Sequence, residues 1–95
     1  MTNNELKEII REQVGEDEAD NIIVLEGDEF ADGCIGISED NRLVYSFEKL
    51  VESLSKQEGI TETDAIEWLE YHTIRSLPYM ASYGNVPIIM HDLMI

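Results

Sequence analysis

The candidate zinc ligands in this sequence are its one cysteine, Cys34, its two histidines, His72 and His91, and Asp92, which follows His91 directly. Thiolate, imidazole and carboxylate groups are the usual zinc ligands, and a zinc site needs three or four protein or water ligands in tetrahedral reach. No pair among them follows a local spacing such as CxxC or HExxH. A zinc site would therefore require these residues to converge in space, and it is kept only as an alternative.

Cys34 together with either histidine would also supply a nucleophile and its base. Cys34 lies between Gly33 and Gly36, at the start of a predicted strand, where a cysteine more often packs as a small hydrophobic residue. The sequence contains no phosphate-binding glycine loop and no nucleophile elbow. We therefore predict a non-catalytic protein without a cofactor, and keep a small enzyme as an alternative.

Paired or clustered carboxylates suggest two further sites, and both have simpler explanations. Residues 28–39 have the length of a calcium-binding loop, with Asp28 first and Glu39 twelfth, but Phe30 at the third position cannot ligate. An acidic turn before a hairpin explains this segment better. Glu67 and Glu70, three residues apart on a predicted helix, are ordinary for an exposed helical surface.

Aromatic and methionine side chains gather near the end of the last predicted helix. Such side chains are enriched at the cores of protein interfaces, where charged residues are scarce. From Arg75 to His91 the chain has no acidic residue, although it is densely acidic elsewhere. The alternative to a contact surface is ordinary core and turn packing. We name these residues the candidate interaction patch: Trp68, Tyr71, His72, Arg75, Tyr79, Met80 and Tyr83.

The elements that position this patch are predicted from helix-capping signals and apolar spacing. Thr61 caps a helix that is expected to end at Pro78. Ser46 caps the preceding helix, which Gly59 closes and whose apolar residues follow helical spacing. Thr2 with Glu5 predicts an N-terminal helix that ends at Gly15.

Strands are predicted where β-branched residues lie between turn signals. A hairpin is expected from Cys34–Ile37 and Arg42–Tyr45, and Ile35 and Ile37 are expected to share a buried face. A buried strand is predicted at residues 21–25 and a closing strand at 86–90. Residues 16–20 read as a loop, and Phe30 is expected to pack on the core.

The order α-β-β-β-α-α-β predicts an α+β fold: a small, three- to four-stranded, mostly antiparallel sheet with a helical hairpin on one face and an N-terminal helix. The 95 residues fit one domain. Residues 1–20 either pack on the body of this domain or form a mobile acidic arm.

Charge is the extreme feature of the composition: 21 acidic residues against 6 basic ones give a formal net charge of -15. Such a field repels nucleic acid and anionic membranes and attracts basic protein surfaces. Simple solubility is the competing explanation. No apolar run approaches the roughly 18 residues that span a bilayer, and no secretory signal is evident. We expect a soluble, intracellular domain.

The run from Ala65 to Met80, followed by Val86-Pro87-Ile88-Ile89, resembles a pattern in small proteins of bacteriophages and bacterial genomes. Those proteins share the phrase Tyr-x-Thr-Ile-Arg-x-Leu-Pro-Tyr-Met, here residues 71–80, and a short closing Pro-Ile-Ile strand. The likeness covers about residues 30–90. The resemblance implies a phage or prophage setting in a bacterial cytoplasm and brings no activity with it.

Three functions follow from these observations. The first is a protein-interaction module, with a basic protein or a second copy in a homodimer as partner, and with neither nucleic acid nor membrane. The second is an acidic mimic of nucleic acid that inhibits a host or defence protein. The third is the small enzyme or metal protein described above.

Overall fold

Strand β2, Leu43–Ser46, is the middle strand of a three-stranded sheet in the computed structural model, which describes residues 1–93. β1, Cys34–Ile37, pairs with β2 antiparallel, and β3, Ile88–Met90, pairs with it parallel. The sheet is therefore small and mixed. Together with the surrounding helices, it confirms the predicted α+β class.

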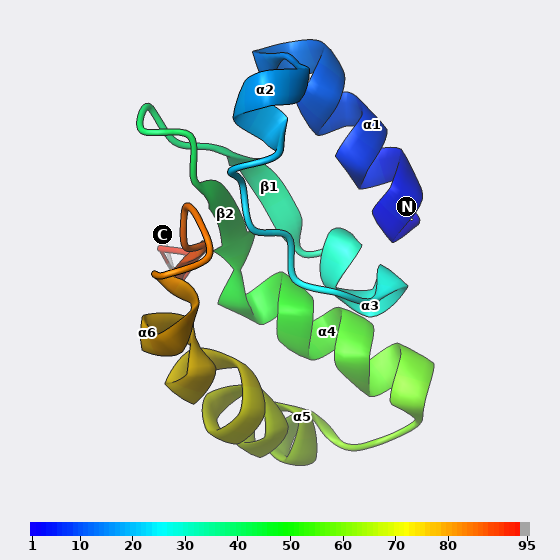
Figure 1. Ribbon diagram of the computed structural model, residues 1–95. Helices are drawn as coiled ribbons and strands as arrows, with labels where there is room; N and C mark the ends of the chain where they lie inside the picture. The colour runs from blue at the N-terminus through cyan, green and yellow to red at the C-terminus, as the bar shows by residue number, and fades with distance from the viewer. Residues whose placement is uncertain (94–95) are drawn as a thin grey trace.

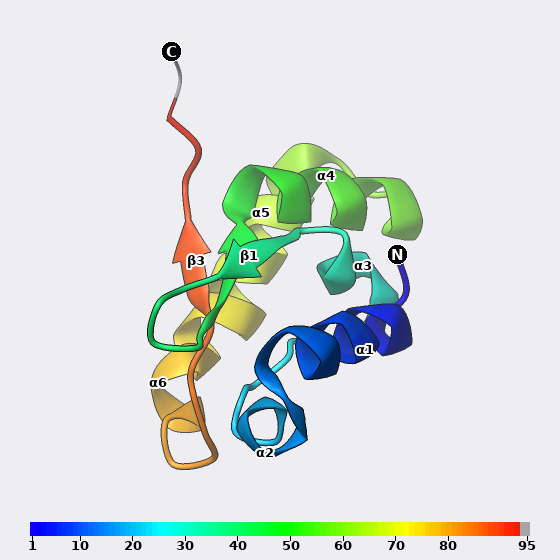
Figure 2. The ribbon, with the colours of Figure 1, turned by 90° about the horizontal axis from the view of Figure 1, so that it is seen from above.

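Helices lie at two ends of the molecule, with β1 and β2 between them (Figure 1). One end carries α1, Asn3–Val14, and α2, Glu16–Ala19. The other carries α4, Phe47–Glu58, and α5, Glu62–Trp68, which pack against each other. Between α1 and α4 lies the short helix α3, Asp28–Ala31, which contacts both (Figure 2).

The predicted helix starts are confirmed by their capping contacts. The Thr2 hydroxyl accepts a hydrogen bond from Glu5 N at 3.2 Å, and the Glu5 carboxylate accepts one from Thr2 N at 3.1 Å. Ser46 and Thr61 cap α4 and α5 in the same way through their side-chain oxygens. Gly59 ends α4 in the left-handed conformation, at φ 65°, which glycine adopts at little cost.

The predicted hairpin is confirmed, but the predicted burial of one side of β1 is not. The register of β1 against β2 shifts between Cys34 and Gly36, which is a β-bulge. A bulge breaks the alternation of side chains along a strand. Ile35 is consequently 44% exposed, so the prediction that it lies on a buried face is wrong. In the turn, Asn41 adopts φ 57°, a conformation that asparagine tolerates.

The strand predicted at residues 21–25 is wrong in extent, because only Ile22 pairs, in an isolated parallel bridge with Asn85. The backbone N–H of Leu25 donates instead to the hydroxyl of Tyr45, at 3.1 Å. A donor used by a side chain cannot join a strand ladder. The prediction of a loop at residues 16–20 is also wrong, since α2 forms there.

α2 is a single turn that apolar periodicity does not reveal. Gly15, at φ 90°, ends α1 and is also the N-cap of α2. The three acidic residues that follow favour a helix N-terminus, where the backbone dipole is positive. Ala19 then packs against the core.

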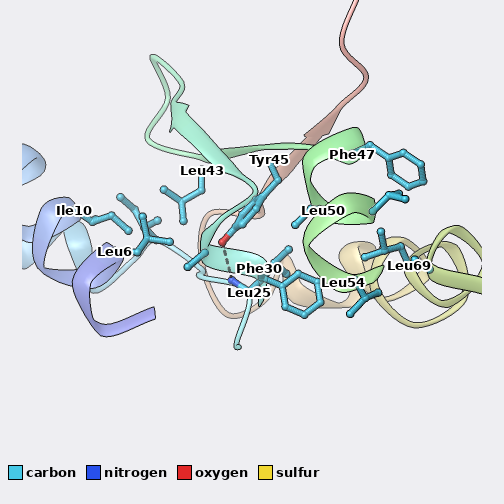
Figure 3. Packing of buried hydrophobic residues seen from close by; sticks show 14 residues of the cluster. Leu6, Ile10, Leu25, Phe30, Leu43, Tyr45, Phe47, Leu50, Leu54 and Leu69 are labelled. Carbon is cyan, nitrogen blue, oxygen red and sulfur yellow. Dashed lines mark hydrogen bonds between the residues drawn. The ribbon is translucent and has the colours of Figure 1, made fainter. Parts of the chain in front are cut away.

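The core joins α1, α3, the sheet, α4 and α5, and its buried side chains meet around Tyr45 (Figure 3). Tyr45 and Leu43 are fully buried on β2, and Phe30 is buried as predicted. The core comprises Leu6, Ile10, Ile22, Leu25, Phe30, Ala31, Leu43, Tyr45, Phe47, Leu50, Val51, Leu54, Ala65 and Leu69.

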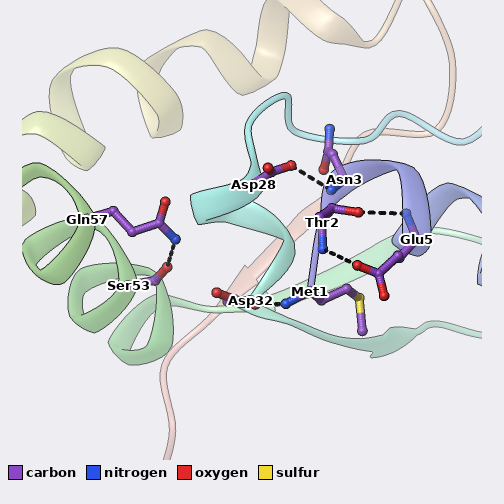
Figure 4. Close-up of polar contacts among 8 residues, drawn as sticks. All are labelled: Met1, Thr2, Asn3, Glu5, Asp28, Asp32, Ser53 and Gln57. Atoms are coloured by element: carbon purple, nitrogen blue, oxygen red, sulfur yellow. Dashed lines mark hydrogen bonds and ion pairs between the residues drawn. The ribbon is translucent and has the colours of Figure 1, made fainter.

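The N-terminal helix is attached to the chain that follows residue 25 (Figure 4). The Met1 amino group donates to Asp32 Oδ1 at 2.7 Å, and the Asn3 backbone N–H donates to Asp28 Oδ1 at 2.8 Å. Leu6 and Ile10 are buried beneath α1. The structure therefore packs α1 on the body of the domain, and mobility of residues 1–20 stays a prediction.

Candidate interaction surface

All the patch residues except Tyr83 lie along a helical path from residue 62 to residue 80, and the hydrogen bonding of this path changes three times. α5 gives way to a π-helical stretch, Leu69–Thr73, in which Ile74 N–H bonds to Leu69 O. A 3-10 turn follows at Ile74–Ser76, where Leu77 N–H bonds to Ile74 O. The short helix α6, Leu77–Met80, completes the path.

Pro78 explains part of this irregularity. A proline has no N–H, so it cannot donate to the carbonyl four residues earlier, which here is that of Ile74. Leu77 N–H bonds to that carbonyl instead, which is the 3-10 bond. Pro78 lies at the start of α6, a position where a proline needs no helical donor. The prediction that the helix ends at Pro78 is therefore wrong, because helical structure continues to Met80.

One side of this path is buried at a four-residue spacing, through Ala65, Leu69 and Thr73. A π-helical stretch has more residues per turn than an α-helix, so a four-residue spacing stays on one side of it. The other side is exposed. The exposed fraction is 40% for Trp68 and 66% for Tyr71, and His72 and Arg75 are exposed as well.

Four of the patch residues form a continuous row of aromatic and cation–π contacts, which we call the aromatic row. The ring centroids of Trp68 and His72 lie 5.0 Å apart, and those of His72 and Tyr71 lie 5.4 Å apart. The Arg75 guanidinium lies 5.0 Å from the centroid of the Tyr71 ring, in the range of a cation–π contact. Phe30, 6.0 Å from Trp68, connects this row to the core.

The remaining patch residues lie on α6 and the turn after it. Tyr79 is 79% exposed and Tyr83 is 83% exposed. Met80 is half-buried and packs against the core, so it supports the surface more than it contributes to it. Binding by these residues stays a prediction, but their exposure fits a contact surface better than core packing.

A hollow of about 490 Å³ lies on the exposed side of the path, lined by Glu67, Glu70, Tyr71 and Arg75. From the sequence alone, the two carboxylates are interpreted as ordinary surface groups, separate from the aromatic residues. The signal that could have connected them is that Tyr71 lies four residues after Glu67 and four before Arg75. On the helix predicted from Thr61 to Pro78, this spacing places the three residues on one side.

Within residues 1–93, Arg75 differs from most basic side chains in having no carboxylate partner. Lys7, Arg11, Arg42 and Lys56 each form an ion pair. Within residues 1–93, Lys49 and Arg75 form none. The Arg75 charge rests on the face of Tyr71 and remains open to solvent.

The metal-ligand types named from the sequence do not meet. Across residues 1–93, no three His, Cys, Asp or Glu side chains come together as metal ligands. His72 belongs to the aromatic row. His91 lies against the Phe47 ring, with centroids 4.7 Å apart, and its Nδ1 is 3.7 Å from Glu48 Oε1. The convergence that a zinc site requires is therefore not found in this part of the chain.

Cys34 is half-buried in β1, with its Sγ 3.9 Å from Gly36 O. Burial raises the pKa of the Cys34 thiol, because a thiolate is poorly solvated there, and the contact with Gly36 offsets this only in part. The group is thus held in its less nucleophilic, protonated form.

The segment with calcium-loop spacing is divided between α3 and β1 and does not wrap around a central point. Two of its carboxylates have partners in the N-terminal segment: Asp28 accepts a hydrogen bond from Asn3, and Asp32 from the Met1 amino group. These contacts fix α1, which gives the acidic turn a structural role.

The exposed acidic groups are most regular on the helices at the N-terminal end. On α1, Glu5, Glu8 and Glu12 recur at three- and four-residue spacing, and all three are exposed. Residues 16–18 of α2 add three more exposed carboxylates. In Figure 1 these helices lie at the opposite end of the molecule from α5 and α6.

Comparisons of the chain with protein-family models, with curated proteins and with solved structures give no match. Over residues 1–93, no helix has the length and apolar character needed to cross a bilayer.

Proposed function

We propose that this protein is a non-catalytic interaction module of phage or prophage type, and that it binds another protein chain through the candidate interaction patch in a bacterial cytoplasm. The observation that carries the proposal is the exposure of Tyr71, Tyr79 and Tyr83, each at 66% or more, on one short part of the chain. Tyrosine offers a large, rigid contact area with a polar tip, and it is enriched where interfaces gain most of their binding energy.

The composition of this part of the chain supports the same proposal. No acidic residue occurs between Arg75 and His91, while the rest of the sequence carries all 21. Interface cores are depleted in charge, because each buried charge must lose its hydration. The resemblance of residues 71–80 to the phrase found in small phage and bacterial proteins supports the phage setting.

The test is a binding measurement with paired surface variants. Light scattering as a function of concentration reports self-association, and an affinity pull-down from bacterial lysate at low and moderate salt reports other partners. Replacing Tyr79 and Tyr83 together with Ser is expected to weaken binding at least about tenfold, as for loss of two exposed aromatic anchors.

A matched control replaces Ile9 with Ser. Ile9 is an exposed apolar side chain on α1, at the other end of the molecule, and its loss should leave binding unchanged. Equal effects of the two changes, or no effect of either, would contradict the proposed surface.

A second candidate function is nucleic-acid mimicry, in which the exposed carboxylates of α1 and α2 occupy a basic groove of a host or defence protein. The regular spacing of Glu5, Glu8 and Glu12 favours it, since phosphates in a strand are also regularly spaced. Here Glu12→Gln, Glu16→Gln and Asp17→Asn together should weaken the pull-down of the partner.

The control for this second test has the same change in charge at the opposite end of the molecule: Glu58→Gln, Glu62→Gln and Asp64→Asn. These groups are exposed on α4 and α5. If both triple variants weaken the pull-down equally, the partner senses only net charge, and mimicry by α1 and α2 fails.

A further inference from the structure

We propose that a second copy of this chain binds the candidate interaction patch, through an antiparallel contact between two copies of the helical path 62–80 with Tyr71 at the two-fold axis. This inference rests on the proposed function and adds the identity of the partner and the geometry of the contact. The features that carry it are the spacing of Glu67, Tyr71 and Arg75, and the absence of a carboxylate partner for Arg75 within residues 1–93.

These three residues form a line along the exposed side of the path. They are four residues apart, as are Ala65, Leu69 and Thr73 on the buried side, which shows that this spacing follows one side of the helix here. All three also line the same hollow. Glu67 and Arg75 each lie four residues from Tyr71, on opposite sides of it along the helical path.

A line with an acidic group, an aromatic ring and a basic group, each four residues from the next, is complementary in charge to itself when reversed. In a two-fold symmetric contact, each residue that touches a second one is touched by it in return. With the axis at Tyr71, Glu67 of each copy faces Arg75 of the other, and the two Tyr71 rings meet. A parallel arrangement would instead place like charges together, so the charge pattern selects the antiparallel one.

Arg75 is already positioned for such a contact. The Tyr71 ring holds its guanidinium 5.0 Å from the ring centroid. The ion pairs within residues 1–93 involve the other basic groups except Lys49, and they leave Arg75 without a carboxylate. A guanidinium that stacks on an aromatic ring still presents N–H donors at its edge, and two of them match the two oxygens of a carboxylate.

Repulsion between the negative charges of two copies limits which of their surfaces can come into contact. Each copy carries a formal charge of -15, so most pairs of surfaces repel. Beyond Tyr71 the chain reaches Arg75 and then has no acidic residue before Asp92. The C-terminal half of the path therefore offers the least repulsion to the acidic N-terminal half of another copy.

The test uses charge reversals, measured by sedimentation over micromolar to millimolar protein concentrations. Glu67→Lys places a lysine opposite Arg75, and Arg75→Glu places a glutamate opposite Glu67. Because each pair occurs twice in a symmetric dimer, each variant alone should associate at least about tenfold more weakly than the parent chain.

The decisive measurement mixes the two variants. In the mixed dimer, Lys at position 67 of one chain faces Glu at position 75 of the other, while the unchanged Arg75 and Glu67 face each other. Both pairs are attractive again, so the mixture should recover dimerisation that neither variant shows alone. Circular dichroism verifies that each variant is folded. Glu39→Lys and Lys49→Glu, with the same changes in net charge at other exposed sites, serve as controls that retain the parent behaviour.

Three results would overturn the inference. One is a parent chain that stays monomeric at all concentrations, and another is a mixture that fails to dimerise. In the third, both single reversals associate as the parent does. In the second and third cases, association that still falls on replacing Tyr79 and Tyr83 with Ser would leave the proposed function standing and contradict only this geometry. In the first case, the pull-down with the same variant decides whether the proposed function stands.

Discussion

At the scale of single residues, removal of the buried Tyr45 hydroxyl should lower the free energy of unfolding. Tyr45 is fully buried, and its Oη accepts the backbone N–H of Leu25 at 3.1 Å. Tyr45→Phe keeps the ring but leaves that N–H without its acceptor, which costs about 1–3 kcal/mol. Urea unfolding should show this loss of stability, while Tyr79→Phe, at a site 79% exposed, should change it by less than about 0.5 kcal/mol. Equal effects of the two changes would contradict a role for the hydrogen bond.

The same residue gives the protein a pH dependence at alkaline pH. Burial raises the pKa of Tyr45 well above its ordinary value, and the hydrogen bond from Leu25 offsets this only in part. In the unfolded chain the phenol ionises near pH 10, so the unfolded state releases a proton first. The stability that Tyr45 supplies is complete below about pH 10 and is lost as pH rises from there toward the folded-state pKa.

Tyr45→Phe lacks this contribution and provides the comparison. The free energies of unfolding of the parent and the variant should converge as pH rises from about 9 to about 11, since only the parent has the ionising phenol at position 45. The exposed tyrosines are common to both chains and cancel. Parallel curves over this range would show that Tyr45 does not ionise differently in the two states.

At the scale of elements, Gly33 allows the end of α3 to lie close to α4. A Cβ at this position would lie 2.8 Å from Leu50 Cγ and still closer to Leu50 Cδ2, and Leu50 is buried. Gly33→Ala should therefore destabilise the fold by about 1–3 kcal/mol, as overpacking does. Gly36→Ala is the matched control in the adjacent strand, because a Cβ there meets nothing within 4 Å.

Thermal or urea unfolding measures both variants. If Gly33→Ala is as stable as the parent chain, Leu50 can move aside without cost, and the close approach of the two elements is not a constraint. A loss in Gly36→Ala equal to that in Gly33→Ala would point to a requirement for backbone freedom in β1 instead.

The elements that could be predicted from the sequence are those with local signals. Thr2, Ser46 and Thr61 act on backbone groups three residues away, so their capping role can be recognised from sequence alone. The hairpin follows equally from a short turn between two apolar runs.

The elements that could not be predicted depend on partners distant in the sequence. Residues 21–25 have the composition of a strand, but Leu25 gives its N–H to Tyr45, twenty residues later. The parallel pairing of β3 with β2 likewise joins residues that no local pattern connects. Pro78 was a sound signal of a break, yet the helix continues past it because the 3-10 turn takes over the carbonyl of Ile74.

The candidate site likewise has a part that could be predicted from the sequence and a part that could not. Exposure of Tyr71, Tyr79 and Tyr83 agrees with the patch named from composition. The hollow beside Tyr71 could not be found from the sequence, because the predicted helix is replaced by a π-helical stretch and a 3-10 turn at residues 69–76, and these set where its lining side chains lie.

At the scale of the whole molecule, the two candidate surfaces lie at opposite ends and differ in their response to salt. Self-association brings together two chains of net charge -15, so screening of their repulsion should strengthen it. Binding of a basic partner by the carboxylates of α1 and α2 should weaken under the same change. Between about 0.01 M and 0.15 M salt the Debye length falls from about 30 Å to about 8 Å, which is enough to separate the two cases.

Sedimentation measures the first response and the pull-down measures the second. Self-association that weakens steadily with salt would mean that its two ion pairs outweigh the repulsion of the whole molecules. A partner whose capture is insensitive to salt would argue against a contact made by the acidic helices.

The position of β2 between an antiparallel and a parallel neighbour has a consequence for the order of folding. Val44 pairs with Gly36 on one side and with Ile88 on the other, so one neighbour is close in sequence and the other follows the whole helical segment. Closing the longer loop costs more chain entropy, and distant pairings form late in folding.

We expect Leu50→Ala in α4 to slow refolding, and Ile89→Ala in β3 mainly to speed unfolding, in stopped-flow measurements. If Ile89→Ala slows refolding as much as Leu50→Ala does, β3 joins early. Otherwise β3 pairs with β2 after the folding transition state. Substitutions that strengthen this pairing then slow unfolding without speeding folding.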